Sequence, residues 1–239
     1  MTVRIDVRDG ANRERALTVA LSTVRRGGIA VVPTESMYAL VTDAFSPRGT
    51  RALRDHKGLQ ATVPLSVLVP SANTVTGIAH RVPSGAKDLM NAFWPGELTI
   101  LLRAGTTLAW DHPPGAPLAV RMPIHPLALA VLQVTGPLAS TAANQQGQPS
   151  ISQAAELDAL ELDEISVILD AGDLSGGMGV DGRSGASENR IISALSTVVD
   201  YSTDTPTIAR EGKVRTEALC RVVPELSPPR STREDDRVQ

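Results

Sequence analysis

The sequence has few of the residues that define several familiar classes of protein. Its 239 residues include a single cysteine, Cys220, which excludes an internal disulfide and a cysteine-based metal cluster. Aromatic residues make up only 3%, so the core must consist mainly of Val, Leu, Ile and Ala. The first residues carry charges where a signal peptide needs an apolar stretch. No apolar run approaches the roughly 20 residues of a membrane span, and we therefore expect a cytoplasmic protein.

The chain also lacks a strong charge of either sign. Its formal net charge is −3 at pH 7, so any affinity for phosphates must come from a local patch of basic residues. Hydrophobic residues make up 42% and charged residues 21%, which is an ordinary globular composition. The length suits one well-filled domain with a short appendage.

Short apolar segments alternate with amphipathic ones along most of the chain. Residues 29–33 form a continuous apolar run of the kind found in strands buried on both faces. Ser84 is predicted to cap a helix that ends near Phe93, and Ser150 and Gln153 have the spacing of a capping box. Further strands are predicted at 65–69, 98–102, 118–120, 138–141, 167–169, 197–199 and 207–209, and further helices before residue 27 and at 126–134. The alternation predicts one α/β domain with a single twisted sheet.

Two segments differ in composition from the rest. Residues 172–189 are rich in Gly, Ser and Asp and predict a mobile loop inserted in the domain. Residues 227–239 contain a Pro-Pro pair and alternating charges, which are typical of a disordered tail. We therefore predict a domain at residues 1–222 and a disordered tail at 223–239.

Polar side chains follow several of the predicted strands directly. They lie in four stretches, at residues 33–38, 57–65, 120–123 and 140–150. Ligands of open α/β sheets bind at such strand ends. Each stretch alone also fits a purely structural role, such as a turn hydroxyl or, for Lys57, a solvated charge at a helix end.

Seven short motifs, in this order, resemble those of the YrdC-type threonylcarbamoyl-adenylate synthases. The family motifs are P-T-E-T-x-Y-G-L, K-x-R, P-G-x-x-T, V-R-x-P, T-S-x-N, S-T-V-x-D and R-x-G. The matching segments here are residues 33–40, 57–59, 95–99, 120–123, 141–144, 196–200 and 210–212. The resemblance runs from about Arg26 to Gly212, which is nearly the whole predicted domain.

The resemblance implies a YrdC-like fold, a twisted and mostly open mixed sheet flanked by helices. It also implies a nucleotidyltransferase, L-threonylcarbamoyladenylate synthase, which makes threonylcarbamoyl-AMP and pyrophosphate from L-threonine, bicarbonate or CO₂, and ATP. In the family this product serves tRNA t6A37 biosynthesis. The implied partners are therefore tRNA or double-stranded RNA and the downstream threonylcarbamoyl transferase machinery. Mg²⁺ is expected to arrive with ATP, without a dedicated metal site in the protein.

The resemblance also assigns the site residues. Phosphoryl transfer depends on positioning and on neutralising charge, and the family pattern makes Lys57 the catalytic residue. Arg121 is implied to bind the threonine carboxylate, which a guanidinium fork does better than a lysine. The other implied threonine-binding residues are Thr34, Thr141 and Ser196, and ATP is implied to contact Lys57, Asn144, Ser150 and Arg210.

Four positions depart from the family pattern. Leu59 replaces the arginine of K-x-R, and Ala142 replaces the serine of T-S-x-N. Leu68 stands where many members have a histidine that contacts threonine, and Ala39 replaces a glycine, which matters only if the backbone needs a positive φ. Losing one preorganised donor typically costs about 3 kcal/mol, or roughly a hundredfold in rate.

Nearby arginines are candidates to supply the missing charge. Arg48, Arg51 and Arg54 are spaced three apart on the helix predicted before Lys57, so they lie near one face. That face either leans toward the nucleotide or is simply solvated. Arg183, in the predicted loop, is another possible donor.

The departures keep two other hypotheses open. One is a non-catalytic or weakly catalytic YrdC-like paralogue that binds double-stranded RNA or nucleotides through their phosphates. The other is an enzyme of the same class whose acceptor is another amino acid or carbamoyl phosphate.

Overall fold

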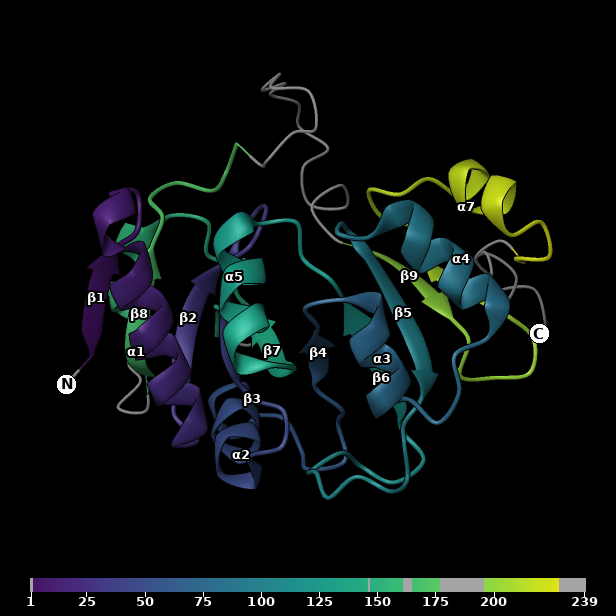
Figure 1. Ribbon diagram of the computed structural model, residues 1–239, viewed down its shortest axis with the longest axis horizontal. Helices are drawn as coiled ribbons and strands as arrows, with labels where there is room; N and C mark the ends of the chain where they lie inside the picture. The colour runs from purple at the N-terminus through teal and green to yellow at the C-terminus, as the bar shows by residue number, and fades with distance from the viewer. Residues whose placement is uncertain (1, 146, 161–164, 177–195, 228–239) are drawn as a thin grey trace, which may run out of the picture.

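A mixed sheet extends through the whole molecule and is flanked by helices (Figure 1). The computed structural model describes residues 2–145, 147–160, 165–176 and 196–227. Within these ranges the sheet has ten strands in the order β1-β8-β2-β3-β7-β4-β6-β5-β9-β10. The predicted fold class, a single α/β domain with a mixed sheet, is confirmed.

The strands and helices have the following bounds. The strands are β1 (Val3–Asp6), β2 (Ile29–Pro33), β3 (Tyr38–Asp43), β4 (Ser66–Leu68), β5 (Leu98–Arg103), β6 (Pro117–Arg121), β7 (Leu138–Ala142), β8 (Ile165–Asp170), β9 (Thr197–Asp200) and β10 (Thr207–Arg210). The helices are η1 (Gly10–Asn12), α1 (Arg13–Arg25), α2 (Pro47–His56), α3 (Ala72–Ile78), α4 (Ser84–Phe93), α5 (Pro126–Thr135), η2 (Ala154–Ala159) and α7 (Thr216–Val222). No helix in the described ranges is long and apolar enough to cross a membrane.

The twist of the sheet brings together strand ends that a flat sheet would separate. Three antiparallel pairings and one parallel pairing lead from β2 to β6 across the sheet. The strands β2 and β6 therefore point in opposite directions. Each pairing adds roughly 20–25° of twist, and β5 lies at a clear angle to β2 in Figure 1. Glu35, two residues after β2, forms an ion pair with Arg121 at the end of β6.

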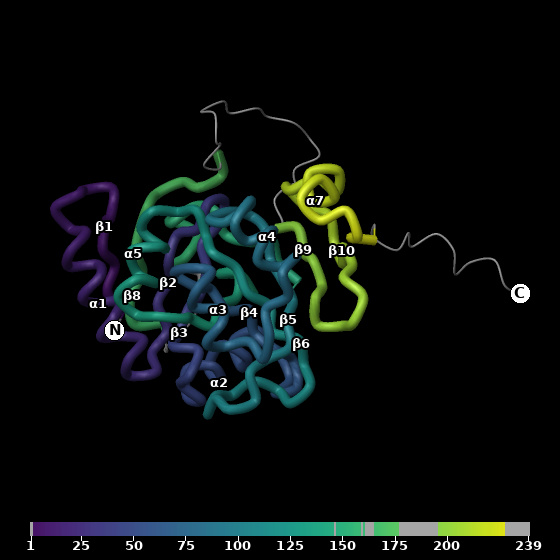
Figure 2. The backbone as a smooth tube through the Cα atoms, turned by 45° about the vertical axis from the view of Figure 1, so that its right-hand side comes forward, coloured from purple at the N-terminus to yellow at the C-terminus, as the bar shows by residue number. Residues whose placement is uncertain are grey.

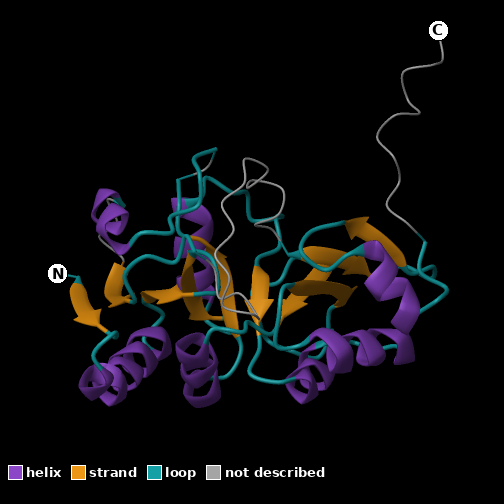
Figure 3. Ribbon diagram, turned by 90° about the horizontal axis from the view of Figure 1, so that it is seen from above, coloured by secondary structure: helices purple, strands orange, loops and turns teal. Residues whose placement is uncertain are grey.

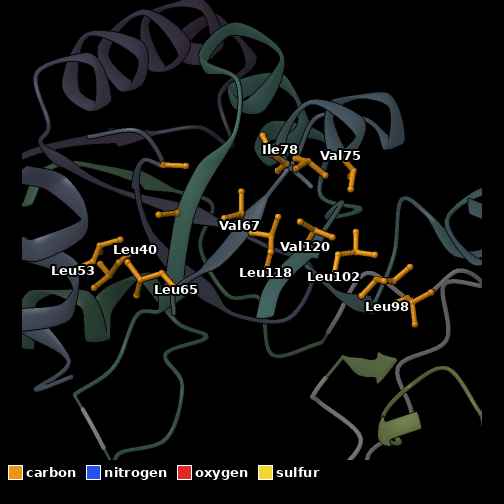
Figure 4. Close-up of a cluster of buried hydrophobic side chains, with 14 of the residues drawn as sticks. Leu40, Leu53, Leu65, Val67, Val75, Ile78, Leu98, Leu102, Leu118 and Val120 are labelled. Atoms are coloured by element: carbon orange, nitrogen blue, oxygen red, sulfur yellow. The ribbon is translucent and has the colours of Figure 1, made fainter. Parts of the chain in front are cut away.

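Two clusters of buried apolar side chains hold the helices on the sheet. The smaller cluster joins α1 and α5 to the half of the sheet around β2, and includes Ala16, Ala20, Val32, Val41, Val131 and Leu132. The larger cluster gathers side chains of α2, α3, α4 and α7, and part of it is drawn in Figure 4. Figure 3 shows helices on both sides of the strands. Both clusters are mainly aliphatic, as the scarcity of aromatic residues requires.

The turn between α1 and β2 packs closely against the start of α2. Gly27 has a φ of 71°, and a Cβ atom there would lie 2.7 Å from Ser46 Oγ, which caps α2 by accepting a hydrogen bond from the N–H of Gly49. We expect Gly27→Ala to lower the free energy of unfolding by about 2–3 kcal/mol, from backbone strain together with a disturbed cap. Urea denaturation measures this loss.

Gly115 offers a matched control for this prediction. Its φ is 76°, but a Cβ atom there would meet nothing within 4 Å. Gly115→Ala should therefore cost only the backbone strain, about 1–2 kcal/mol. Equal losses in the two variants would contradict the packing argument.

Two helix starts differ from the predictions. Ser84 is the first residue of α4, and the N-cap position belongs to Pro83, which has no side-chain donor or acceptor. The capping box at Ser150 and Gln153 was wrong, because Gln153 makes no capping hydrogen bond and the segment that follows is the 3-10 helix η2. The spacing of a capping box does not ensure the backbone geometry that capping needs.

The described chain extends further than the predicted domain boundary at residue 222. Val223 and Leu226 are buried against the larger cluster, and Ser227 accepts a hydrogen bond from the N–H of Ile208. Residues 223–227 therefore pack on the domain, which corrects the predicted start of the tail. Residues 228–239 lie outside the described ranges. Of the predicted loop at 172–189, only residues 172–176 are described.

Candidate active site

Lys57 lies directly after α2 and is largely buried. Its Nζ donates to the backbone oxygen of Asn144 at 2.7 Å and also to Asn144 Oδ1. Burial lowers the pKa of Lys57 below its ordinary value. In the described part of the chain Lys57 has no acidic partner, since both of its contacts are neutral oxygens. Its positive charge is therefore available to an anionic ligand.

Arg121 forms the second charged centre. Its Nε donates to the backbone oxygen of Gly96 at 3.2 Å, and its Nη2 is paired with Glu35 Oε1. Glu35 is only 2% exposed, so the pair is withdrawn from solvent. Burial, and then the nearby charge of Arg210, lower the pKa of Arg121 to about 10, which leaves the guanidinium positive at neutral pH.

Arg210 and Ser196 join this centre from the far end of the sheet. Arg210 Nη2 donates to the backbone oxygen of Ser196 at 2.8 Å, and its Nε donates to the same oxygen at 3.2 Å. The hydroxyls of Ser196 and Thr99 lie 2.8 Å apart. Burial lowers the pKa of Arg210 from its usual value. The charge of Arg210 also lowers the pKa of Arg121, so we group Arg210 and Ser196 with Arg121.

The remaining predicted residues surround these two centres. Thr34 Oγ1 donates to the backbone oxygen of Met37 at 2.6 Å, so its proton closes the turn between β2 and β3. Thr141 lies opposite Leu40 in the sheet and is half-buried. Ser150 is also half-buried and precedes Ile151, whose carbonyl accepts a hydrogen bond from the N–H of Tyr38. That contact holds the segment around Ser150 against the start of β3.

The structure thus gathers the predicted residues into two groups. Lys57 and Asn144 form the first group, and Arg121, Arg210 and Ser196 form the second. Among the described residues, no hydrogen bond or ion pair joins the groups directly. Glu35 connects the second group to the turn that Thr34 closes. Figure 2 traces the chain through these elements.

Sequence reasoning did not assign roles to Glu35 and Thr99, although both stand in matched motifs. The signal for Glu35 was a carboxylate two residues after an entirely apolar strand. Its inward direction and its pairing with Arg121 depend on the twist of the sheet, which residue order does not reveal.

The four departures from the family pattern have distinct environments. Leu68 is buried in the smaller cluster and pairs with Arg121 across the sheet. Ala142 lies opposite Ala39. Ala39 continues a regular strand, and no non-glycine residue in the described ranges has a positive φ, so a glycine is not needed there. Leu59 packs against the larger cluster.

The three arginines of α2 lie in two different environments. Arg54 is 4% exposed and is held by Asp111, with Nη1 at 2.6 Å from Asp111 Oδ2. Arg48 and Arg51 line a different cavity, beside the start of α2. The ion pair with Asp111 engages Arg54 elsewhere, and the hypothesis that Arg48 or Arg51 reaches the nucleotide stays a prediction. Arg183 lies outside the described residues.

Comparisons with known proteins define the class to which this chain belongs. Residues 22–179 match the family model Sua5_yciO_yrdC, described as "Telomere recombination". A Mycobacterium tuberculosis protein named putative threonylcarbamoyl-AMP synthase is 34% identical over 224 residues, 93% of this chain and 96% of its own length. The chain therefore belongs to the Sua5/YciO/YrdC family, as the motifs predicted.

Longer relatives match over the same region. The threonylcarbamoyl-AMP synthase of Bacillus subtilis is 30% identical, and the match covers 92% of this chain and 60% of that protein. The structure of Pyrococcus abyssi Sua5 complexed with L-threonine matches with a TM-score of 0.75 and 25% identity. That match covers 95% of this chain and 62% of the Pyrococcus chain.

Proposed function

We propose that this protein is an L-threonylcarbamoyladenylate synthase, which forms threonylcarbamoyl-AMP and pyrophosphate from L-threonine, bicarbonate or CO₂, and ATP. The observation that carries the proposal is the buried guanidinium of Arg121, placed beside Glu35 and Arg210. The names of the curated relatives, and the threonine complex of a similar protein, support it.

The second group suits the amino-acid substrate. The guanidinium of Arg121 can bind the threonine carboxylate through two parallel hydrogen bonds. Glu35 Oε2 is buried and has no hydrogen-bond partner among the described residues, so it is the acceptor for the threonine ammonium. The hydroxyls of Ser196 and Thr99 are the groups near Arg210 that suit the threonine side chain.

The first group suits the phosphates. The threonine ammonium first loses a proton to water, and the neutral amine adds to CO₂ and loses a second proton to water, which gives a carbamate. A carbamate oxygen then bonds to the α-phosphorus of ATP, and the bond from the α-phosphorus to the oxygen shared with the β-phosphorus breaks. Negative charge then accumulates on the departing pyrophosphate. The ammonium of Lys57, held by Asn144, neutralises that charge and is therefore the catalytic residue. Ser150 and Arg210 complete the proposed contacts to ATP.

Magnesium belongs to the proposal as a companion of ATP. Mg²⁺ commonly keeps several waters and binds through substrate phosphates. In the described part of the chain, no three or more His, Cys, Asp or Glu side chains lie together as metal ligands. Supply of the product for tRNA modification, transfer by downstream machinery and a cytoplasmic location belong to the same proposal.

Pyrophosphate release tests the function. Purified protein is incubated with ATP, bicarbonate and threonine, and pyrophosphate is followed with and without threonine. The expected result is release that requires threonine and yields threonylcarbamoyl-AMP by mass spectrometry. Threonine-independent release, or tight salt-sensitive RNA binding without use of ATP, would contradict the proposal.

Leu59→Arg tests whether the missing charge limits the rate. We expect kcat to rise about tenfold. This gain is smaller than the roughly hundredfold effect of an ideally placed donor, because residue 59 is half-buried against the larger cluster. The loss of that packing should lower the melting temperature. Leu59→Met, which keeps the packing without adding charge, is the control. A folded Leu59→Arg variant with an unchanged kcat would show that the charge is not limiting.

A further inference from the structure

A cavity of about 630 Å³ lies between the end of α1, the turn that leads to β2, one face of α2 and Ser166 near the start of β8. Its walls include Arg26, Arg48 and Arg51, together with Gly27, Asp55 and Ser166. The tight packing of Gly27 against Ser46 forms part of one wall. The contacts proposed above for threonine and ATP do not use Arg48 or Arg51.

This cavity is separate from the candidate active site. Neither Lys57 nor Asn144 is among the residues that line it. Asp55 lines it only two residues before Lys57, but successive residues of a helix are turned by about 100°, so these two side chains leave α2 on opposite sides. A ligand in the cavity would therefore leave the space around Lys57 free.

The charge of the cavity is positive. Arg26, Arg48 and Arg51 are exposed, and none of them forms an ion pair within the described ranges. Asp55 is the one acidic residue among its lining residues. The N-terminal end of α2 adds the positive end of a helix dipole. This concentration of positive charge stands out in a chain whose net charge is −3.

The shape and the lining define the chemistry of the ligand. Guanidinium groups bind phosphates through paired hydrogen bonds. The volume lies in the range of sites for small molecules. No aromatic side chain lines the cavity, so the structure offers no ring on which a nucleobase could stack. We propose that Arg26, Arg48 and Arg51 bind the phosphate chain of a small oligophosphate at a site distinct from the candidate active site.

Calorimetric titration with tripolyphosphate tests this site, and the test does not depend on the proposed function. Lys57→Met removes the lysine proposed to neutralise the ATP phosphates and should keep one binding event. Adding Arg26→Gln, Arg48→Gln and Arg51→Gln to Lys57→Met should weaken that event about tenfold. Adding Arg13→Gln, Arg15→Gln and Arg81→Gln instead removes three exposed arginines elsewhere and should change it less than twofold.

A second variant keeps the test decisive if the three substitutions disturb folding. Asp55→Asn removes the acidic lining residue and should tighten binding about threefold. ATP and GTP are then titrated into the same proteins to identify the source of the phosphate chain. If their binding is weakened by the three arginine substitutions as much as that of tripolyphosphate, the site binds the phosphate tail of a nucleotide. Binding lost in Lys57→Met alone overturns the proposal. Arginine-dependent binding of an RNA oligonucleotide, but not of tripolyphosphate, also overturns it.

Discussion

Arg121→Met is expected to lower kcat/KM for threonine at least about a hundredfold, because the substrate carboxylate loses its buried, charged partner. The guanidinium stays positive at neutral pH although burial lowers its pKa to about 10, so the wild-type site has this charge throughout the physiological range. Threonine-dependent pyrophosphate release measures the effect. The same variant should leave binding of ATP within a few-fold of wild type.

Stability separates this catalytic loss from simple misfolding. Arg121→Met leaves the carboxylate of Glu35 buried without its partner, which typically costs about 3–5 kcal/mol. Adding Glu35→Gln removes the uncompensated charge and should restore most of the free energy of unfolding without restoring activity. Urea denaturation of the single and double variants gives both values. A double variant as unstable as Arg121→Met would argue against a coupled pair.

Lys57→Met should reduce kcat about a hundredfold to a thousandfold and leave the KM for threonine nearly unchanged, because the lost charge acts on the phosphates. The pH profile gives a second measurement. Since burial lowers the pKa of Lys57, wild-type activity should fall as pH rises through a value below the ordinary 10.5. Lys57→Met should lack this dependence. An unchanged kcat, or a larger effect on threonine KM, would contradict the assignment.

The effect of Lys57 on stability should change with pH in the direction opposite to its effect on activity. Between the lowered pKa of folded Lys57 and its ordinary value, the unfolded chain binds more protons than the folded chain. The contribution of Lys57 to the free energy of unfolding therefore rises with pH in that window, while activity falls. Comparing wild type with Lys57→Met isolates this contribution.

The strand that the sequence predicts best is one that is buried at every position. Residues 29–33 are apolar throughout and form β2, which is buried at every position. By contrast, β1 has one buried residue among exposed ones, so its pattern gives no clear signal. The capping spacing near residue 150 failed because it fixes neither the backbone angles nor the hydrogen bond of a cap.

For the candidate site, the sequence supplied residue types but not partners. The motifs identified Arg121, yet its pairing with Glu35 arises from the twist accumulated across the sheet. The spacing of Arg48, Arg51 and Arg54 predicted a shared helix face. It could not show that Arg54 meets Asp111, 57 residues along the chain, or that the other two border a separate cavity.

The end of the described chain has a consequence for self-association. β10 is the last strand of the sheet, and an edge strand with free N–H and C=O groups is a template for pairing with another molecule. Ser227 occupies part of this edge through its bridge to Thr207 and its bond from Ile208. The buried side chains of Val223 and Leu226 hold it there. These few residues therefore shield this edge of the sheet, though not the opposite edge at β1, against pairing with another molecule.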